Sequence, residues 1–180
     1  MLKIYAVDIE NGFDDTTLSL FLNICESEKK NRIINMKNKR ASELSLAANA
    51  LAKFAIKNTF GIPIKEQIFV VGQHGKPFLK NTNNVHFSVS HSGSMAVCAV
   101  SDCMVGIDIQ KITRFSKKTA DFIGLLSDCK TDEFFKTWTQ LEASAKRTGE
   151  PLISFVKSVS APTPQTFSIK YKDYYISVSR

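Results

Sequence analysis

Two oxygen-bearing side chains alternate along the short segment VGIDIQ, residues 105–110. In an extended chain Asp108 and Gln110 lie on one face, about 6–7 Å apart, while Ile107 and Ile109 lie on the other. Carboxylate and amide oxygens at this separation can share a hydrated cation such as Mg²⁺. Taken by itself, however, the pattern is more typical of an edge strand with one face in solvent.

A second charged pair lies on the segment 134–149, FFKTWTQLEASAKRTG. Glu142 and Lys146 are one helical turn apart and form an i,i+4 pair. They lie beside an apolar stripe with helical spacing, made of Phe134, Trp138, Leu141 and Ala145. Taken alone, this arrangement is typical of an ion pair on the surface of an amphipathic helix.

Ser90 and His91 end a strand-like segment and are followed by Ser92 and Gly93. A lone histidine is more often structural than catalytic. In the nearby sequence HGKP, residues 74–77, a glycine frees the backbone and Lys76 can meet a phosphate. None of these signals is specific alone, so only their order along the chain can indicate a function.

The elements that would position these residues alternate between the two types of secondary structure. Helices mixed with mostly antiparallel strands predict an α+β fold. Residues 113–130 show no clear pattern and are expected to form a loop. The predicted strands are Lys3–Ile9, Ile68–Val71, Phe87–Ser90, Met95–Val100 and Val105–Ile109, with a hairpin over 167–180. The predicted helices are Leu18–Cys25, one or two helices within 27–60, and Thr131–Thr148.

The 180 residues carry a net charge of +7, and much of this charge is concentrated between residues 26 and 57. This stretch holds the acids Glu26, Glu28 and Glu43 and a larger set of bases: Lys29, Lys30, Arg32, Lys37, Lys39, Arg40, Lys53 and Lys57. Such a patch suits nucleic acid, a phosphorylated small molecule or an acidic protein, although a solvated helix face is the simpler alternative. We expect a soluble, cytoplasmic protein, because no apolar run is long enough for a membrane span and the first ten residues do not resemble a signal peptide.

Taken in order, four motifs resemble the surfactin-type 4′-phosphopantetheinyl transferase family. They are Gly-Lys-Pro at 75–77, Phe-x-x-Ser-His-Ser at 87–92, Gly-Ile-Asp-Ile at 106–109 and Trp-Thr-x-x-Glu-x-x-x-Lys at 138–146. The resemblance implies two similar α+β halves related by a pseudo-twofold axis, with mostly antiparallel sheets and packed helices. We place the halves at residues 1–100 and 101–180, with coenzyme A between them.

The resemblance also implies a role for each matching residue. Glu142 and Lys146 would be catalytic, with Glu142 as the general base. A magnesium ion would be held by Asp108, Gln110 and Glu142. The residues expected to contact coenzyme A are Lys29, Arg32, Arg40, Lys76, Pro77, Ser90, His91, Asp108 and Lys146.

The activity implied is transfer of 4′-phosphopantetheine from coenzyme A to a serine of an acyl or peptidyl carrier protein, with release of adenosine 3′,5′-bisphosphate. The family resemblance implies a monomer that acts in secondary metabolism on an acidic carrier protein, which suits the positive net charge. No aromatic-rich basic motif interleaves with the basic patch, so we expect no nucleic-acid partner, and we expect no membrane partner.

Three positions depart from the family pattern. Gln110 replaces an acid, Leu141 replaces a lysine, and Leu44 stands where an arginine is expected. All three remove charge from the same cleft. The alternative hypothesis is therefore a weak or silent relative that binds coenzyme A or a carrier protein without transfer.

Overall fold

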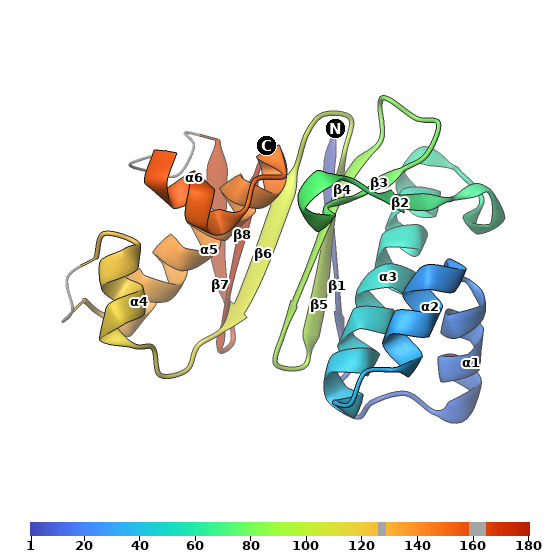
Figure 1. Ribbon diagram of the computed structural model, residues 1–180, viewed down its shortest axis with the longest axis horizontal. Helices are drawn as coiled ribbons and strands as arrows, with labels where there is room; N and C mark the ends of the chain where they lie inside the picture. Colours follow the sequence, from blue (N-terminus) through green and yellow to red (C-terminus); the bar gives the residue numbers. More distant parts are fainter. Residues whose placement is uncertain (126–128, 159–164) are drawn as a thin grey trace.

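A computed structural model of the protein describes residues 1–125, 129–158 and 165–180. Two three-stranded antiparallel sheets lie face to face in the middle of the molecule, and helices cover the outer side of each sheet (Figure 1). This arrangement confirms the α+β class with antiparallel sheets and packed helices.

The first part of the chain builds one sheet, a short ribbon and three helices. The sheet has the order β1-β5-β4, and the separate ribbon pairs β2 with β3. Short 3₁₀ turns cover Ile64–Glu66 and Gln73–Gly75. The elements are β1 (Leu2–Asp8), α1 (Asp15–Asn23), α2 (Ser27–Ile34), α3 (Lys39–Phe60), β2 (Phe69–Val71), β3 (Pro77–Leu79), β4 (His86–Ser92) and β5 (Met95–Ser101).

The second part repeats the plan of the first within its described residues. An edge strand is followed by a long helix and then by a hairpin whose last strand takes the middle of the sheet, which has the order β6-β8-β7. The division at residue 100 stays a prediction; β5 ends at Ser101 and β6 begins at Gly106. The elements are β6 (Gly106–Lys111), α4 (Lys117–Phe122), α5 (Thr131–Thr148), α6 (Leu152–Ser158), β7 (Thr166–Tyr171) and β8 (Tyr174–Ser179).

Helix α3 has clear start and stop signals in the sequence. The side chain of Asn38 accepts a hydrogen bond from the amide of Ala41, and Gly61 ends the helix with φ of 74°. Small residues let the helix lie close to the first sheet. The alanines buried on this side are Ala47, Ala48, Ala52 and Ala55.

Helix α5 covers the outer face of the second sheet. It carries acids in its first turn and bases in its last, and it ends at Gly149 with φ of 81°. Phe134, Leu141 and Ala145 are buried as the apolar stripe predicts, and Trp138 packs against them. Phe135 and Thr139 lie on the same side of the helix as Glu142 and Lys146, next to the apolar stripe, and they are buried too. The buried face of α5 is therefore wider than the sequence indicated.

An apolar layer joins the two sheets. Alternate residues of the central strands β5 and β8 point into this layer, together with residues of β6. The layer contains Met95, Val97, Ala99, Val105, Ile107, Ile109, Tyr174, Ile176 and Val178. Burying these side chains on both sheets is what fixes their face-to-face packing.

The expectation of a loop over residues 113–130 was wrong for part of its length. Residues 126–128 lie outside the described residues, but 117–122 form α4. Ser116 caps that helix by accepting from the amide of Thr119, and Ala120 is buried. The helix is too short to show periodicity in the sequence, as is α6, which the sequence analysis did not predict.

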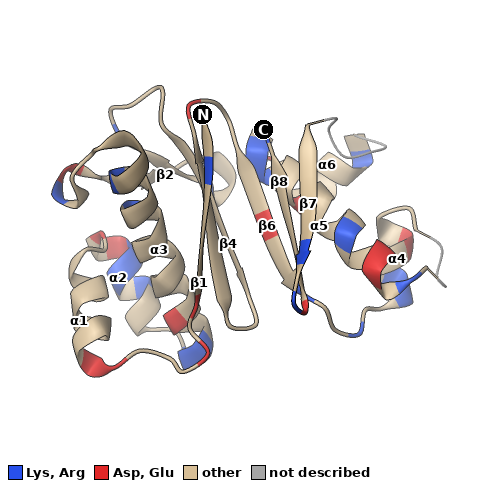
Figure 2. Cartoon of the chain, turned by 180° about the vertical axis from the view of Figure 1, so that it is seen from behind, with Lys and Arg blue, Asp and Glu red and all other residues tan. Residues whose placement is uncertain are grey.

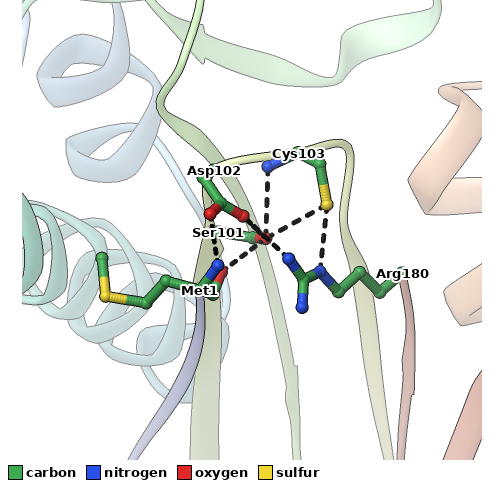
Figure 3. Close-up of polar contacts among 5 residues, drawn as sticks. All are labelled: Met1, Ser101, Asp102, Cys103 and Arg180. Atoms are coloured by element: carbon green, nitrogen blue, oxygen red, sulfur yellow. Dashed lines mark hydrogen bonds and ion pairs between the residues drawn. The ribbon is translucent and has the colours of Figure 1, made fainter.

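A second junction ties the ends of the described chain together (Figure 3). Arg180 donates to Asp102 at 2.9 Å and to the sulfur of Cys103 at 3.0 Å, and the amino group of Met1 is ion-paired with Asp102. Ser101 donates to the carbonyl of Met1 at 2.8 Å. The turn between β5 and β6 is thus held to β1 and β8 at once.

Charged residues gather on the helices and turns, whereas the strands are largely uncharged (Figure 2). Within the described ranges, no helix combines the length and apolar character that a bilayer span requires.

Gly106 makes the closest contact between β6 and α5, and we predict that it does not tolerate a side chain. A Cβ there would overlap the carbonyl oxygen of Ala143 and the amide nitrogen of Arg147. Gly106→Ala should lower the free energy of unfolding by about 1–3 kcal/mol through overpacking. In the control Gly72→Ala the new Cβ meets its nearest atom at 3.4 Å, so the loss should be smaller. Urea denaturation measures both variants, and equal losses would contradict the packing argument.

Candidate active site

A cavity of about 550 Å³ lies where α2, α3, β4, β6, α5 and the β2–β3 ribbon meet. Residues far apart in the sequence line it, and they come from both parts of the chain. Most of the residues singled out from the sequence are brought together here: Lys29, Arg32, Lys76, Pro77, Ser90, His91, Asp108, Gln110, Glu142 and Lys146.

Asp108 lies at the floor of the cavity and is only 1% exposed. Its Oδ1 accepts a hydrogen bond from Ser90 Oγ at 2.7 Å and from Lys146 Nζ at 2.6 Å. Lys146 also donates to Ser90 Oγ at 3.0 Å, which closes a triangle between β4, β6 and α5. β6 is indeed an edge strand, but the alternative that its Asp108 face lies in solvent is wrong. The alternation correctly predicted the face of this side chain, but that face is covered by α5.

Gln110 and Glu142 lie on either side of this triangle. Gln110 Nε2 donates to the second oxygen of Asp108 at 3.2 Å. Burial raises the pKa of Glu142, the negative charge of Asp108 raises it further, and Lys146 partly offsets the shift. Within the described residues, no hydrogen bond to the Glu142 carboxylate is found. This acid is thus held near a second carboxylate and has free oxygens.

The chemistry of this donor set suits a hard divalent cation. Asp108, Glu142 and Gln110 line one cavity, and Mg²⁺ prefers one or two carboxylates completed by substrate phosphates and water. The described residues contain no cluster of three or more His, Cys, Asp or Glu side chains suited to a metal. A cation bound here would therefore depend on oxygens of the substrate.

Basic side chains line the part of the cavity formed by α2. Lys29 donates to Ser45 Oγ at 2.8 Å, and burial together with the nearby charge of Arg32 lowers its pKa. His91 is exposed on β4; desolvation lowers its pKa, as do the charges of Lys146 and Lys29. Lys29 and Arg32 can bind an anionic ligand such as a phosphate at this end of the cavity, although the acids Glu26 and Glu28 line the same end.

Lys76 lines the cavity, but its ammonium group is already bound by the protein. Nζ donates to the carbonyl of Arg147 at 2.9 Å and to that of Val105 at 3.2 Å. Burial lowers the pKa of Lys76 to about 8, and the charge of Arg147 adds to this. This lysine thereby links the β2–β3 ribbon to the second sheet and α5.

Arg40 is the one predicted binding residue that the structure leaves out of the cavity. Its guanidinium donates to the carbonyl of Ile9 at 2.6 Å and forms an ion pair with Glu43. These partners hold the side chain at the start of α3. Leu44, where the family pattern expects an arginine, is buried in the core and presents no charge to the cavity.

Lys53 contributes nothing to the surface charge that the sequence analysis attributed to it. It is 2% exposed and donates to Glu26 at 2.7 Å and to the carbonyl of Gln67 at 2.9 Å. Glu26 also accepts from the amide of Phe69, and both of these residues line the cavity. The sequence did not predict that Glu26 and Phe69 line the cavity. Their contacts join residues 27 to 43 positions apart, and no local pattern in the sequence indicates such contacts.

Comparison with known proteins gives consistent matches. Residues 14–104, half of the chain, match the family described as 4′-phosphopantetheinyl transferase, N-terminal. A 4′-phosphopantetheinyl transferase of Bacillus subtilis is 28% identical over 96% of this chain and 78% of its own. The transferase gsp of Aneurinibacillus migulanus is 27% identical over 96% and 76%. Among solved structures, a holo-(acyl-carrier-protein) synthase of Bacillus anthracis in complex with CoA (3′,5′-ADP) aligns over 55% of this chain and 91% of its own, with 21% identity and a TM-score of 0.44.

The buried pair of Asp108 and Lys146 should behave as a coupled unit. In a double-mutant cycle with Asp108→Asn and Lys146→Met, we expect a coupling free energy of about 1–3 kcal/mol, since either single change leaves a desolvated partner. The exposed pair of Lys170 and Asp132 is the control, and its coupling should be clearly smaller. Equal coupling in the two cycles would show that burial adds nothing to the Asp108 pair.

Lys76 should make stability depend on pH in the alkaline range. Its pKa is about 8 in the folded protein and 10.5 ordinarily, so the unfolded chain binds the proton more tightly. The contribution of Lys76 to stability therefore rises with pH between these two values. Denaturant unfolding at about pH 7.5 and about pH 9.5 should show wild type gaining stability relative to Lys76→Met. The exposed Lys80→Met controls for the loss of one charge, and a pH-independent difference between wild type and Lys76→Met would refute the assignment.

Proposed function

Because the chain belongs to the 4′-phosphopantetheinyl transferase family, we propose that it transfers 4′-phosphopantetheine from coenzyme A to a serine of an acyl or peptidyl carrier protein. Adenosine 3′,5′-bisphosphate is the second product. The observation that carries this proposal is the single cavity in which Asp108, Glu142 and Lys146 face the basic side chains of α2.

The charge distribution in the cavity supports a ligand with phosphates at two separate positions. Lys29 and Arg32 lie on α2, with His91 nearby on β4, and they suit the nucleotide end of coenzyme A. Lys146 lies across the cavity beside Asp108 and suits the pyrophosphate. Lys76 supports the cavity wall through its two carbonyl contacts and presents its aliphatic stem, with Pro77, to the ligand.

Glu142 is suited to accept the proton of the attacking serine. Its raised pKa moves the carboxylate toward the range of a working general base, and its oxygens have no hydrogen-bond partner in the described chain. As the serine oxygen bonds to the β-phosphorus of coenzyme A, the bond from that phosphorus to the bridging oxygen breaks. The proton passes to Glu142, and adenosine 3′,5′-bisphosphate leaves with the bond electrons.

Asp108, Gln110 and Glu142 are the residues that would hold Mg²⁺. When bound, the ion would neutralise charge on the pyrophosphate so that a hydroxyl can approach. Lys146 adds a fixed positive charge at the same place, and Ser90 keeps Asp108 oriented toward it. The protein itself thus places the carboxylates of Asp108 and Glu142 and the ammonium group of Lys146 in one partly desolvated site. Electrostatic interactions are stronger there than in bulk water.

The net charge of +7 supports an acidic carrier protein as the partner of this protein. We propose that the protein itself acts as a cytoplasmic monomer in secondary metabolism. The competing function is a relative that binds coenzyme A or a carrier protein and transfers nothing. Three positions where the family pattern has a charged residue support this alternative. Gln110 brings no charge to the site, and Leu141 and Leu44 are buried apolar side chains.

Mass spectrometry of apo-carrier proteins incubated with this protein, coenzyme A and Mg²⁺ separates the two functions. Transfer adds the mass of 4′-phosphopantetheine to the carrier, and omission of coenzyme A is the control. If fatty-acid, polyketide and peptide-synthetase carriers all stay unmodified while coenzyme A still binds, the binding-only function is correct.

Gln110 is the position at which a single change should strengthen the site. Gln110→Glu places a third carboxylate beside Asp108, so we expect about a tenfold lower Mg²⁺ concentration for half-maximal transfer. Gln110→Ala is the matched variant and should raise that concentration. A magnesium titration of the initial rate measures all three proteins. The same magnesium requirement in all of them would remove Gln110 from the metal site.

A further inference from the structure

Strand β4 carries three serine hydroxyls in succession on one face, after His86. Ser88, Ser90 and Ser92 alternate along it and therefore point to the same side of the sheet. Their partners on β5 are Ala99, Val97 and Met95, residues that point into the layer between the two sheets. This face of β4 meets β6.

Amides on the free edge of β6 donate to these serine hydroxyls. In a larger sheet, the same amides would donate to carbonyls of a neighbouring strand. The amide of Ile107 donates to Ser88 Oγ at 3.1 Å, and the amide of Lys111 donates to Ser92 Oγ at 2.9 Å. The other edge of β6 pairs with β8. The contact of the Ile107 amide is buried, so leaving this amide without a partner would cost free energy. The contact of the Lys111 amide lies at the exposed end of β6, where its loss costs less.

The two contacts lie on either side of Asp108. Ile107 directly precedes Asp108, and Lys111 follows it three residues later. Ser90, which lies between Ser88 and Ser92 on β4, donates to the carboxylate of Asp108. Ser92, unlike Ser88 and Ser90, does not line the cavity. An effect of Ser92 on the reaction is therefore indirect, either through β6 or through its neighbour His91 on β4.

We propose that Ser88 and Ser92 are positioning residues for the transfer reaction, and this rests on the proposed function. Their hydroxyls fix the β6 backbone against β4, so that Asp108 from the second sheet is held in register with the ligand-binding residues of the first. A displacement of reacting groups by about 1 Å is enough to cost on the order of a hundredfold in rate.

Ser92→Ala is the sharpest test because it changes no residue of the cavity wall. We expect amide hydrogen exchange at Lys111, measured by NMR, to become about tenfold faster, as for the loss of one hydrogen bond. The kcat of transfer should fall by about tenfold or more. The KM for coenzyme A should stay within about twofold, because Lys29 and Arg32 lie on α2 and the side chain of His91 points to the opposite face of β4 from Ser92. Ser92→Thr keeps the hydroxyl and should restore both values.

Tyr5→Phe is the matched control for loss of a single hydroxyl. Tyr5 bonds Thr59 Oγ1 at 2.9 Å within the first part of the chain, away from β6. This variant should leave kcat and the exchange at Lys111 unchanged. A similar fall in kcat for Tyr5→Phe would mean that general destabilisation, not positioning, explains Ser92→Ala.

The exchange measurement also separates this inference from the proposed function. If the wild-type protein modifies no carrier, the proposed function fails, and calorimetry of coenzyme A binding with and without Mg²⁺ replaces kcat as the readout. Positioning then predicts that Ser92→Ala loses most of the affinity gained from Mg²⁺ but keeps the metal-free affinity. Faster exchange at Lys111 with unchanged transfer, or with unchanged Mg²⁺-dependent binding, overturns the proposal in either case.

Discussion

The edge of β6 meets β4 through side chains, although the two strands lie in different sheets. Ile107 and Lys111 donate their amides to serine hydroxyls, and Ser90 donates to the carboxylate of Asp108. The cavity is lined from both sides of this junction, so its shape depends on how the two strands are aligned. The apolar layer behind the junction packs the sheets, but apolar contacts are non-directional and do not set register.

Burying Asp108 at this junction dictates much of the surrounding chemistry. A carboxylate that is 1% exposed needs charged or hydrogen-bonding partners, which Lys146 and Ser90 supply. The neighbouring Glu142 is itself desolvated, which raises its pKa, and the negative charge of Asp108 raises it further. The site thus holds one acid, Asp108, that is paired with Lys146, and a second, Glu142, whose carboxylate has no hydrogen-bond partner among the described residues. Polar groups arranged in advance lower the reorganisation needed during reaction.

Much of this could be predicted from local patterns. The alternation of Ile107 and Ile109 with Asp108 placed the acid on the correct face of β6, and Gly61 and Gly149 marked the ends of the two long helices. The roles of residues that depend on distant partners could not be predicted. Lys53 looks like a surface lysine until Glu26 and Gln67 are seen around it, and Arg40 is drawn to the carbonyl of Ile9. The serines of β4 look like a polar strand face because their acceptor role exists only beside β6.

Paramagnetic broadening by Mn²⁺ in the presence of coenzyme A tests directly whether the site is built across this junction. In an NMR spectrum of the labelled protein, we expect the amide signals of residues 88–92, 106–111 and 139–146 to broaden together and to recover when Mg²⁺ is added in excess. Broadening confined to one of the two sheets, or centred on the helices α1 and α4, would contradict this expectation, because the metal would then not bind between β4, β6 and α5.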